Sequence, residues 1–166
     1  MRTLAAQPLD RTEYAPYGDV IEATEEWRAA NQGTARKSER LAPLVDRRAG
    51  RARPNVSVFR CSPRPLPVQV ALLEKHPAST QVFVPMNARR YLVVVSLGDE
   101  APDLSTMRAF VASGTQAITY RPGVWHHPMI ALDAETDFVS LVFEDGTELD
   151  CVEAPLDAGS RVVVTA

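Results

Sequence analysis

Residues 91–97 read Tyr-Leu-Val-Val-Val-Ser-Leu, and this run is one of a series of short apolar segments that decide the fold. β-Branched and aromatic residues dominate these segments, as is typical of strands. Working outward from this run, we predict strands over residues 56–61, 68–73, 81–84, 91–97, 107–111, 117–120, 128–132 and 137–143. Turn signals separate them at intervals of roughly 8–12 residues, which favours an antiparallel sandwich or small barrel. The sequence therefore predicts an all-β fold.

Proline punctuates the chain more often than glycine, with 13 prolines against 8 glycines. Because proline lacks a backbone donor, its positions mark where strands stop and corners begin. No amphipathic segment of helix length lies between the predicted strands, and neither a GxGxxG nor a P-loop pattern occurs. These features argue against the nucleotide-binding α/β folds.

Short helical elements are expected only near the N-terminus. Asp10 and Glu13 have the spacing of a capping box, which predicts a helix over residues 11–17, and Gly18 could end it with a positive φ. Residues 25–53 are polar, arginine-rich and weakly periodic. We expect them to form a loop-and-helix excursion over the surface or against a neighbouring subunit.

Length and composition bound the remaining possibilities. The chain has 166 residues, 45% of them hydrophobic, so we expect one domain over residues 1–166, with residues 157–166 as a frayed tail or an edge strand. The net charge of −3 and the lack of a basic cluster argue against nucleic acid as a partner. No apolar run approaches the length of a membrane span. Cys61 and Cys151 form no CxxC pair, which favours free thiols and a cytoplasmic location.

The three histidines of the chain lie in two short stretches, residues 73–77 and 124–128. Residues two apart on a strand share a face, so Glu74 and His76 can point into a barrel together. Gln81 follows a proline-led bend and can bring its amide oxygen to the same place. This arrangement resembles the first metal motif of the cupin barrels, with glutamate in its first position and glutamine in its last. The resemblance implies a cupin-like β-barrel or sandwich.

The second stretch supplies a further ligand. Gly123 and His126 have the spacing of the second cupin motif, and His127, its neighbour, must face the other side of a regular strand. We therefore predict Glu74, His76, Gln81 and His126 as a mixed nitrogen and oxygen site for nickel, zinc, manganese or iron, with no organic cofactor. The alternative is that the histidines only form hydrogen bonds within the core and bind no metal.

Two arginines and two aromatic residues are candidates for substrate binding. Arg60 and Arg108 stand inside apolar strands, where a buried guanidinium needs an anionic partner such as a substrate carboxylate. The alternative is a salt bridge within the chain or exposure on the outer face. Tyr120 and Trp125 are candidates for the pocket mouth, the alternative being that they belong to the core. No GxSxG pattern supports acyl transfer.

Several blocks of sequence follow one another in a specific order. The blocks are residues 17–22 (YGDVIE), 31–34 (NQGT), 74–77 (EKHP), 81–86 (QVFVPM), 102–110 (PDLSTMRAF) and 124–128 (VWHHP). Together they resemble the ureidoglycolate lyase family, from about Tyr17 to Pro155. The resemblance implies a homodimeric β-barrel that cleaves (S)-ureidoglycolate to glyoxylate and urea in allantoin degradation and depends on nickel.

The chain departs from the family pattern at four places. Ala88 follows Asn87 where a glycine is expected, and Lys37 stands where an arginine is expected. Residues 142–143, Val-Phe, replace an Asp-Arg pair, and about the last ten residues have no counterpart. Because the Asp-Arg pair is absent, two other functions stay open. The protein could be another metal-dependent cupin enzyme acting on a small hydroxy acid, or a cupin that binds a small acid without turnover.

The chemistry of the resemblance suits the candidate residues. Ureidoglycolate is a hemiaminal, so loss of its hydroxyl proton and protonation of the departing nitrogen release urea and an aldehyde acid. A histidine suits either proton transfer, and each positioned transfer contributes roughly 10²–10⁴-fold. We therefore predict His76, His126 and Glu74 as the catalytic residues, with Glu74 serving as a metal ligand or as a base.

Overall fold

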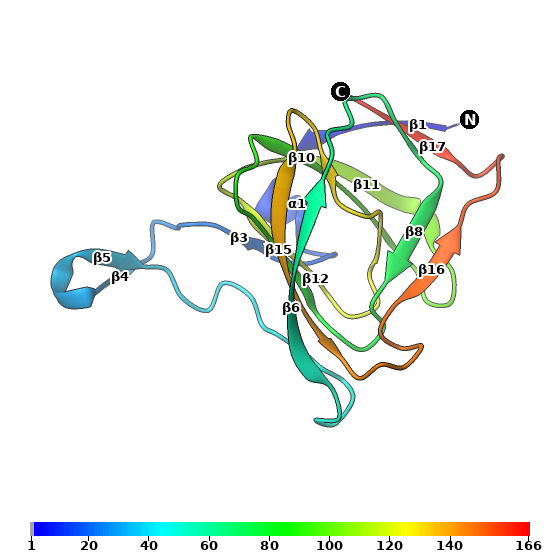
Figure 1. Ribbon diagram of the computed structural model, residues 1–166. Coiled ribbons are helices and arrows are strands. Elements are labelled where there is room, and N and C mark those ends of the chain that lie inside the picture. The colour runs from blue at the N-terminus through cyan, green and yellow to red at the C-terminus, as the bar shows by residue number, and fades with distance from the viewer. Residues whose placement is uncertain (1) are drawn as a thin grey trace.

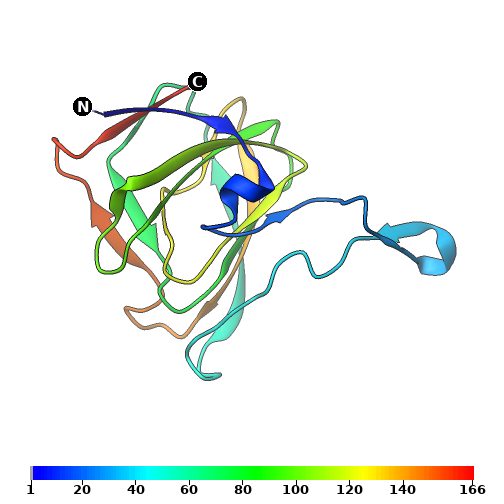
Figure 2. The ribbon, with the colours of Figure 1, turned by 180° about the vertical axis from the view of Figure 1, so that it is seen from behind.

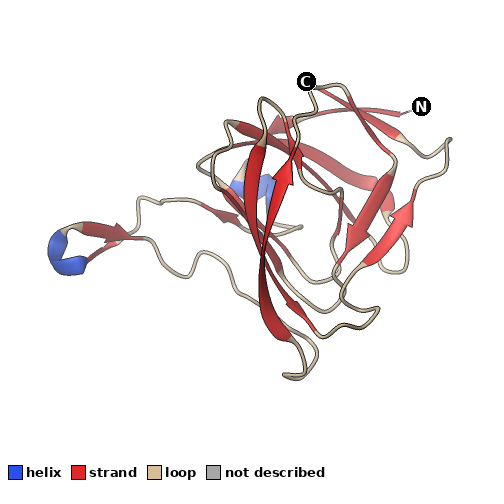
Figure 3. Cartoon of the chain, in the orientation of Figure 1, coloured by secondary structure: helices blue, strands red, loops and turns tan. Residues whose placement is uncertain are grey.

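The computed structural model of the protein describes residues 2–166, and strands make up most of its regular structure (Figures 1 and 3). This confirms the predicted all-β class. The strands are β1 (Arg2–Ala5), β2 (Gln7–Pro8), β3 (Val20–Ile21), β4 (Arg28–Ala30), β5 (Ala35–Lys37), β6 (Arg53–Cys61), β7 (Val68–Val70), β8 (Leu72–Lys75), β9 (Gln81–Pro85), β10 (Arg90–Leu97), β11 (Asp103–Ser113), β12 (Ala117–Tyr120), β13 (Trp125–His126), β14 (Ile130–Ala131), β15 (Thr136–Glu144), β16 (Val152–Pro155) and β17 (Val162–Thr165). The two helices are α1 (Arg11–Tyr14) and the 3₁₀ turn η1 (Asn31–Gly33).

Three sheets form the body of the molecule. A seven-stranded central sheet has the order β16-β8-β13-β10-β11-β2, with β14 also paired to β10. A five-stranded sheet, β3-β12-β9-β15-β6, covers one of its faces, and a three-stranded sheet, β1-β17-β7, covers the other. The pairing is antiparallel except where β1 meets β17 and β2 meets β11. The arrangement therefore agrees with the predicted antiparallel barrel or sandwich.

The apolar run at residues 91–97 lies in β10. The position of this strand explains why polar and apolar residues do not alternate along it. Tyr91, Val93 and Val95 point into the core between the central and five-stranded sheets, which we call the inner core. Leu92 and Val94 point into the core under the three-stranded sheet, the outer core. Because both faces of β10 are covered, both sets of side chains are apolar.

The predicted strands are present, with differences at their ends. Residues 68–73 divide at Ala71 into β7 and β8, and the segment predicted over residues 128–132 narrows to β14. Seven strands were not predicted: β1, β2, β3, β4, β5, β13 and β16. They are short or at the ends of the chain, where two to four residues give little periodic signal.

The N-terminal helix is shorter than its capping signal suggests. The carboxylate of Asp10 accepts hydrogen bonds from the backbone N–H groups of Thr12 and Glu13, so the predicted cap is present. The α-helix ends at Tyr14, and Gly18 does not have a positive φ. A Cβ at Gly18 would lie 1.8 Å from the carbonyl oxygen of Thr119, so close backbone approach is what requires glycine here.

Residues 28–37 form a hairpin arm, β4-η1-β5, that stands away from the body of the molecule (Figures 1 and 2). Its two strands pair only with each other. Left-handed conformations at Asn31, Gln32 and Gly33 make its tip. The expected surface excursion is thus a hairpin with a single 3₁₀ turn. Within residues 2–166, no helix is long and apolar enough to cross a membrane.

The C-terminal segment differs from the prediction. Strand β17 lies between β1 and β7, so it is neither a frayed tail nor an edge strand. Val162 and Val164 are buried in the outer core. The N-terminal strand, which the sequence analysis did not detect, supplies the partner that makes β17 central.

Candidate metal centre

Glu74, His76 and His126 converge between the central and five-stranded sheets. Each offers a ligand atom, and these atoms all lie within 4.8 Å of one another. Glu74 on β8 is the register partner of His126 on β13, and its Oε1 lies 3.5 Å from Nε2 of the imidazole. The rings of His76 and His126 are nearly parallel, with centroids 5.6 Å apart. The structure thus brings together two stretches of sequence some 50 residues apart.

Backbone carbonyls hold both imidazoles by the same nitrogen. Nδ1 of His76 lies 2.5 Å from the carbonyl oxygen of Asp150, and Nδ1 of His126 lies 3.0 Å from that of Val124. Because a carbonyl only accepts, each Nδ1 carries the proton and each Nε2 keeps a free lone pair. Both Nε2 atoms are buried and have no hydrogen-bond partner. Such atoms need a ligand, and a metal ion or a polar substrate would supply it.

Gln81 lines the same space from the five-stranded sheet. Its amide nitrogen lies 3.4 Å from the hydroxyl of Ser140, whereas its buried Oε1 has no hydrogen-bond partner. Gln81 is the register partner of Tyr120, so both side chains leave the sheet on one face. The ring of Tyr120 stacks on His126 with centroids 3.9 Å apart. The amide oxygen therefore suits the role of an additional oxygen ligand.

The burial of Glu74 and His76, and the charges of the side chains around them, determine the protonation states of these two residues. Burial lowers the pKa of His76 below its ordinary value, and protonation of His126 would lower it further, which favours the neutral form of His76 that binds metals. Burial pushes the pKa of Glu74 upward, but the neighbouring imidazoles, His126 foremost, outweigh it and leave that pKa below its ordinary value. A neutral imidazole beside an ionised carboxylate is the ligand state that a divalent cation requires.

The chain is similar to known proteins along most of its length. The family model for ureidoglycolate lyase matches residues 1–163. This chain belongs to the ureidoglycolate lyase family. The ureidoglycolate lyase of Burkholderia cepacia is 46% identical over 158 residues, which cover 93% of this chain and 86% of the relative. The ureidoglycolate lyase of Salmonella typhimurium is 42% identical over 139 residues, which cover 83% and 86% respectively.

A solved structure shares the fold at lower identity. A dTDP sugar isomerase from Desulfovibrio desulfuricans G20 superposes with a TM-score of 0.51 at 17% identity, covering 87% of this chain and 88% of the other. At this identity the likeness concerns the fold alone. It agrees with the cupin-like barrel that the histidine motifs imply.

The aromatic candidates of this family member separate to opposite faces. Tyr120 lies in the inner core against His126. Trp125 lies in the outer core, where the ammonium of Lys75 is 4.4 Å from its ring centroid. Adjacent strand residues point in opposite directions, so Trp125 cannot join His126 at the site. The prediction that Trp125 binds substrate is therefore wrong, and its alternative as a core residue applies.

The two arginine candidates are both exposed, which contradicts the expected burial, and they lie on different sheets. Arg60 is exposed and donates to both carboxylate oxygens of Asp137, at 2.8 and 2.9 Å, so its guanidinium is occupied away from the site. Arg108 pairs with Val95, which also pairs with His126, so Arg108 and His126 lie on the same face two strands apart. No carboxylate among residues 2–166 forms an ion pair with Arg108, whose hydrogen bond is to the carbonyl oxygen of Met107. Only Arg108 remains a candidate for binding an anion.

The sequence analysis missed one feature of the site and named another only as a departure from the family pattern. The carbonyl oxygen of Asp150, which holds His76, belongs to the backbone and leaves no signature in residue type. Val142, one of the departures from the ureidoglycolate lyase pattern, is buried and is the register partner of Gln81. Its position places that departure in the wall of the site.

Proposed function

We propose that this protein is a carbon–nitrogen lyase that cleaves (S)-ureidoglycolate to glyoxylate and urea in the degradation of allantoin. The observation that carries the proposal is the convergence of Glu74, His76 and His126, with free Nε2 atoms, in a member of the ureidoglycolate lyase family. Residues 1–166 serve as one catalytic domain in this proposal.

Glu74 is the proton carrier of the proposed reaction. Its side chain is 21% exposed, whereas that of His126 is 1% exposed, so the carboxylate is the member of the group that an entering substrate meets first. The carboxylate takes the hydroxyl proton of the hemiaminal while the carbon–nitrogen bond breaks and the carbonyl forms. It then gives the same proton to the departing nitrogen, which completes urea. The atoms balance without water or a redox partner.

The buried free atoms define the proposed metal ligands. They are Nε2 of His76, Nε2 of His126 and Oε1 of Gln81, with Glu74 able to join them. A divalent ion held there, nickel in our proposal, would supply Lewis acidity toward the hydroxyl and carboxylate of the substrate. Tyr120 fixes the plane of His126 by stacking on it. Arg108 is the proposed anchor for the substrate carboxylate.

Timed product release from the purified protein tests the function. We expect urea and glyoxylate to appear together at equal rates, with loss of both after His76→Ala or His126→Ala. Ammonia as the first nitrogen product would contradict the lyase reaction and indicate amide hydrolysis. Metal analysis of protein purified without chelators tests the nickel site.

A second candidate function follows from Val142. This apolar side chain lies beside Gln81 on the neighbouring strand, at the place where the family pattern is expected to have a polar pair. Another metal-dependent reaction on a small hydroxy acid, or binding without turnover, would suit an altered wall. Oxygen uptake with iron in the absence of urea release would favour the first, and ligand binding without any turnover would favour the second.

A second copy of this chain is the proposed partner. Val58, Val139 and Val84 are register partners across β6, β15 and β9, and Val58 and Val84 are exposed on the outer face. Strand β6 ends this sheet, so its nine residues also offer an unpaired backbone edge. A two-fold contact would cover both features. We expect light scattering to give the mass of a dimer for the wild type and for Ser113→Glu, and that of a monomer for Val58→Glu.

The proposed location is the cytoplasm. Both Cys61 and Cys151 are free, and free thiols persist in a reducing compartment. Quantifying the protein in cytoplasmic and periplasmic fractions of a bacterial host tests this.

A further inference from the structure

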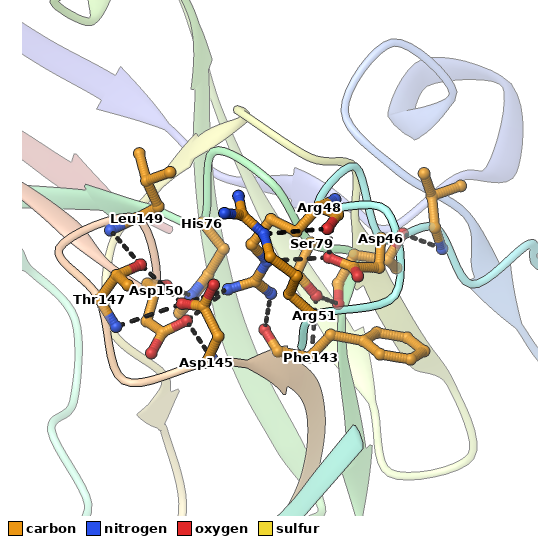
Figure 4. A network of polar contacts seen from close by, with 12 residues as sticks. Asp46, Arg48, Arg51, His76, Ser79, Phe143, Asp145, Thr147, Leu149 and Asp150 are labelled. Carbon is orange, nitrogen blue, oxygen red and sulfur yellow. Dashed lines mark hydrogen bonds and ion pairs between the residues drawn. The ribbon is translucent and has the colours of Figure 1, made fainter. Parts of the chain in front are cut away.

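A buried arginine holds together the chain segments that surround His76. The side chain of Arg48 is 3% exposed and forms ion pairs with Asp46 at 2.9 Å, Asp145 at 3.4 Å and Asp150 at 2.5 Å. It also donates to the carbonyl oxygen of Phe143. Figure 4 shows this network with His76 beside it. A buried guanidinium with several anionic partners is a fixed element, because its loss would leave three largely buried carboxylates without a compensating charge.

The network determines where the backbone of Asp150 lies. The carboxylate of Asp150 accepts hydrogen bonds from the backbone N–H groups of Asp145 and Gly146, at 3.0 and 2.7 Å, in addition to its contact with Arg48. These contacts close the loop over residues 145–150. With the carboxylate fixed, the carbonyl oxygen of the same residue faces Nδ1 of His76 (Figure 4).

The segment that carries Arg48 is tied to the other side of His76 as well. Asp46 forms a β-bridge with Ser79, and the backbone N–H of Arg47 donates to the carbonyl oxygen of Ala78 at 2.8 Å. The hydroxyl of Ser79 in turn accepts a hydrogen bond from the backbone N–H of Phe143. The chain after His76 and the loop that holds its Nδ1 are therefore joined through the region around Arg48.

We infer that Arg48 is a positioning residue for His76: through Asp150 it keeps a carbonyl oxygen on Nδ1, so that the ring stays in one tautomer and presents Nε2 to the site. The inference rests on the proposed role of His76 as a ligand. Groups that orient a ligating histidine typically change metal affinity by 10–100-fold when they are removed. A purely structural anchor would change stability and leave the ring tautomer as it is.

The test compares two variants of the network with a matched control. Arg48→Lys loses the fork that reaches several carboxylates, and Asp150→Asn removes one charge while keeping the side-chain shape. Arg90→Lys is the control, because Arg90 also makes a two-pronged pair, with Asp133, but on the surface. The readouts are the ¹⁵N shifts of the His76 ring in metal-free protein, Ni²⁺ affinity by calorimetry, and the melting temperature.

We expect His76 in the wild type and in Arg90→Lys to carry its proton on Nδ1. In Arg48→Lys and Asp150→Asn we expect a mixture of tautomers and about 10–100-fold weaker Ni²⁺ binding. Folded variants of both kinds with the wild-type tautomer and wild-type affinity would overturn the inference. If Arg48→Lys does not fold, Asp150→Asn decides. Absence of Ni²⁺ binding by the wild type would count against the proposed metal site alone, because the tautomer measurement does not need metal.

Discussion

The substitution Glu74→Gln separates the two roles open to this carboxylate. Glutamine keeps the shape of the side chain and removes one negative charge 3.5 Å from Nε2 of His126. If Glu74 acts as a base, glutamine cannot replace it, because an amide does not take up the hydroxyl proton. If Glu74 acts only as a metal ligand, glutamine can replace it in part, because the amide oxygen can still coordinate the metal.

The expected loss of metal affinity can be worked from the geometry. A divalent cation and a carboxylate about 4 Å apart interact by roughly 8 kcal/mol at the effective dielectric of a site near the surface. Since the Glu74 side chain is 21% exposed, we halve this value for solvent screening, to about 4 kcal/mol. That corresponds to roughly 700-fold weaker binding of the divalent ion, because about 1.4 kcal/mol is ten-fold. Loss of positioned proton transfer should lower turnover further, by about 10²–10⁴-fold.

The assay measures both quantities on the same preparation. Calorimetric titration of chelator-treated protein gives the Ni²⁺ affinity, and urea release at saturating Ni²⁺ gives the turnover number. Glu135→Gln is the control, since it makes the same change at a side chain that is 61% exposed. Recovery of full turnover by Glu74→Gln at saturating Ni²⁺ would refute the assignment of Glu74 as the base.

Four further outcomes follow from the structure. Gly18→Ala places a Cβ 1.8 Å from the carbonyl oxygen of Thr119, so we expect a loss of about 3 kcal/mol or more in the free energy of unfolding, measured by urea denaturation. Burial lowers the pKa of both His76 and His127, so the unfolded chain binds more protons below about pH 6.5. The stability of metal-free protein should therefore be full above that pH and fall as the pH drops through the lowered values, which melting curves between pH 7 and 5 would show; a flat profile would contradict this. Burial and nearby carboxylates raise the pKa of Cys151 to about 11, so its alkylation at pH 9 should be roughly fifty-fold slower than that of the denatured chain. Chelator treatment should lower the melting temperature of protein purified with its metal, and added Ni²⁺ should restore it.

The strands and the histidine group were predictable because their signals are local. The β-branched run of β10 and its neighbours marks strands by composition alone. The two-residue spacing of Glu74 on β8 and His76 just past its end, and the glycine before His126, predicted inward-facing side chains without knowledge of the tertiary structure. Pairing of Glu74 with His126 then follows once the two strands are neighbours.

The parts that could not be predicted depend on partners far away in the chain. Arg60 and Arg108 look alike in sequence, and only the presence of Asp137 beside one of them decides which guanidinium is free. Trp125 was assigned to the site although alternation with His126 placed it on the other face, an inference that the sequence already allowed. Arg48 gave no signal at all, because its three carboxylate partners are spread between residues 46 and 150.

The parallel pairing of β1 with β17 joins residues 2–5 to residues 162–165. During synthesis, β1 must therefore wait unpaired in this sheet until residues 162–165 have left the ribosome. A nascent chain that stops before residue 162 would leave Val68 and Val70 without the covering layer that buries them. Such fragments would expose apolar surface and tend to aggregate, so quality control of translation should distinguish sharply between a chain that includes residues 162–165 and one that stops just before them.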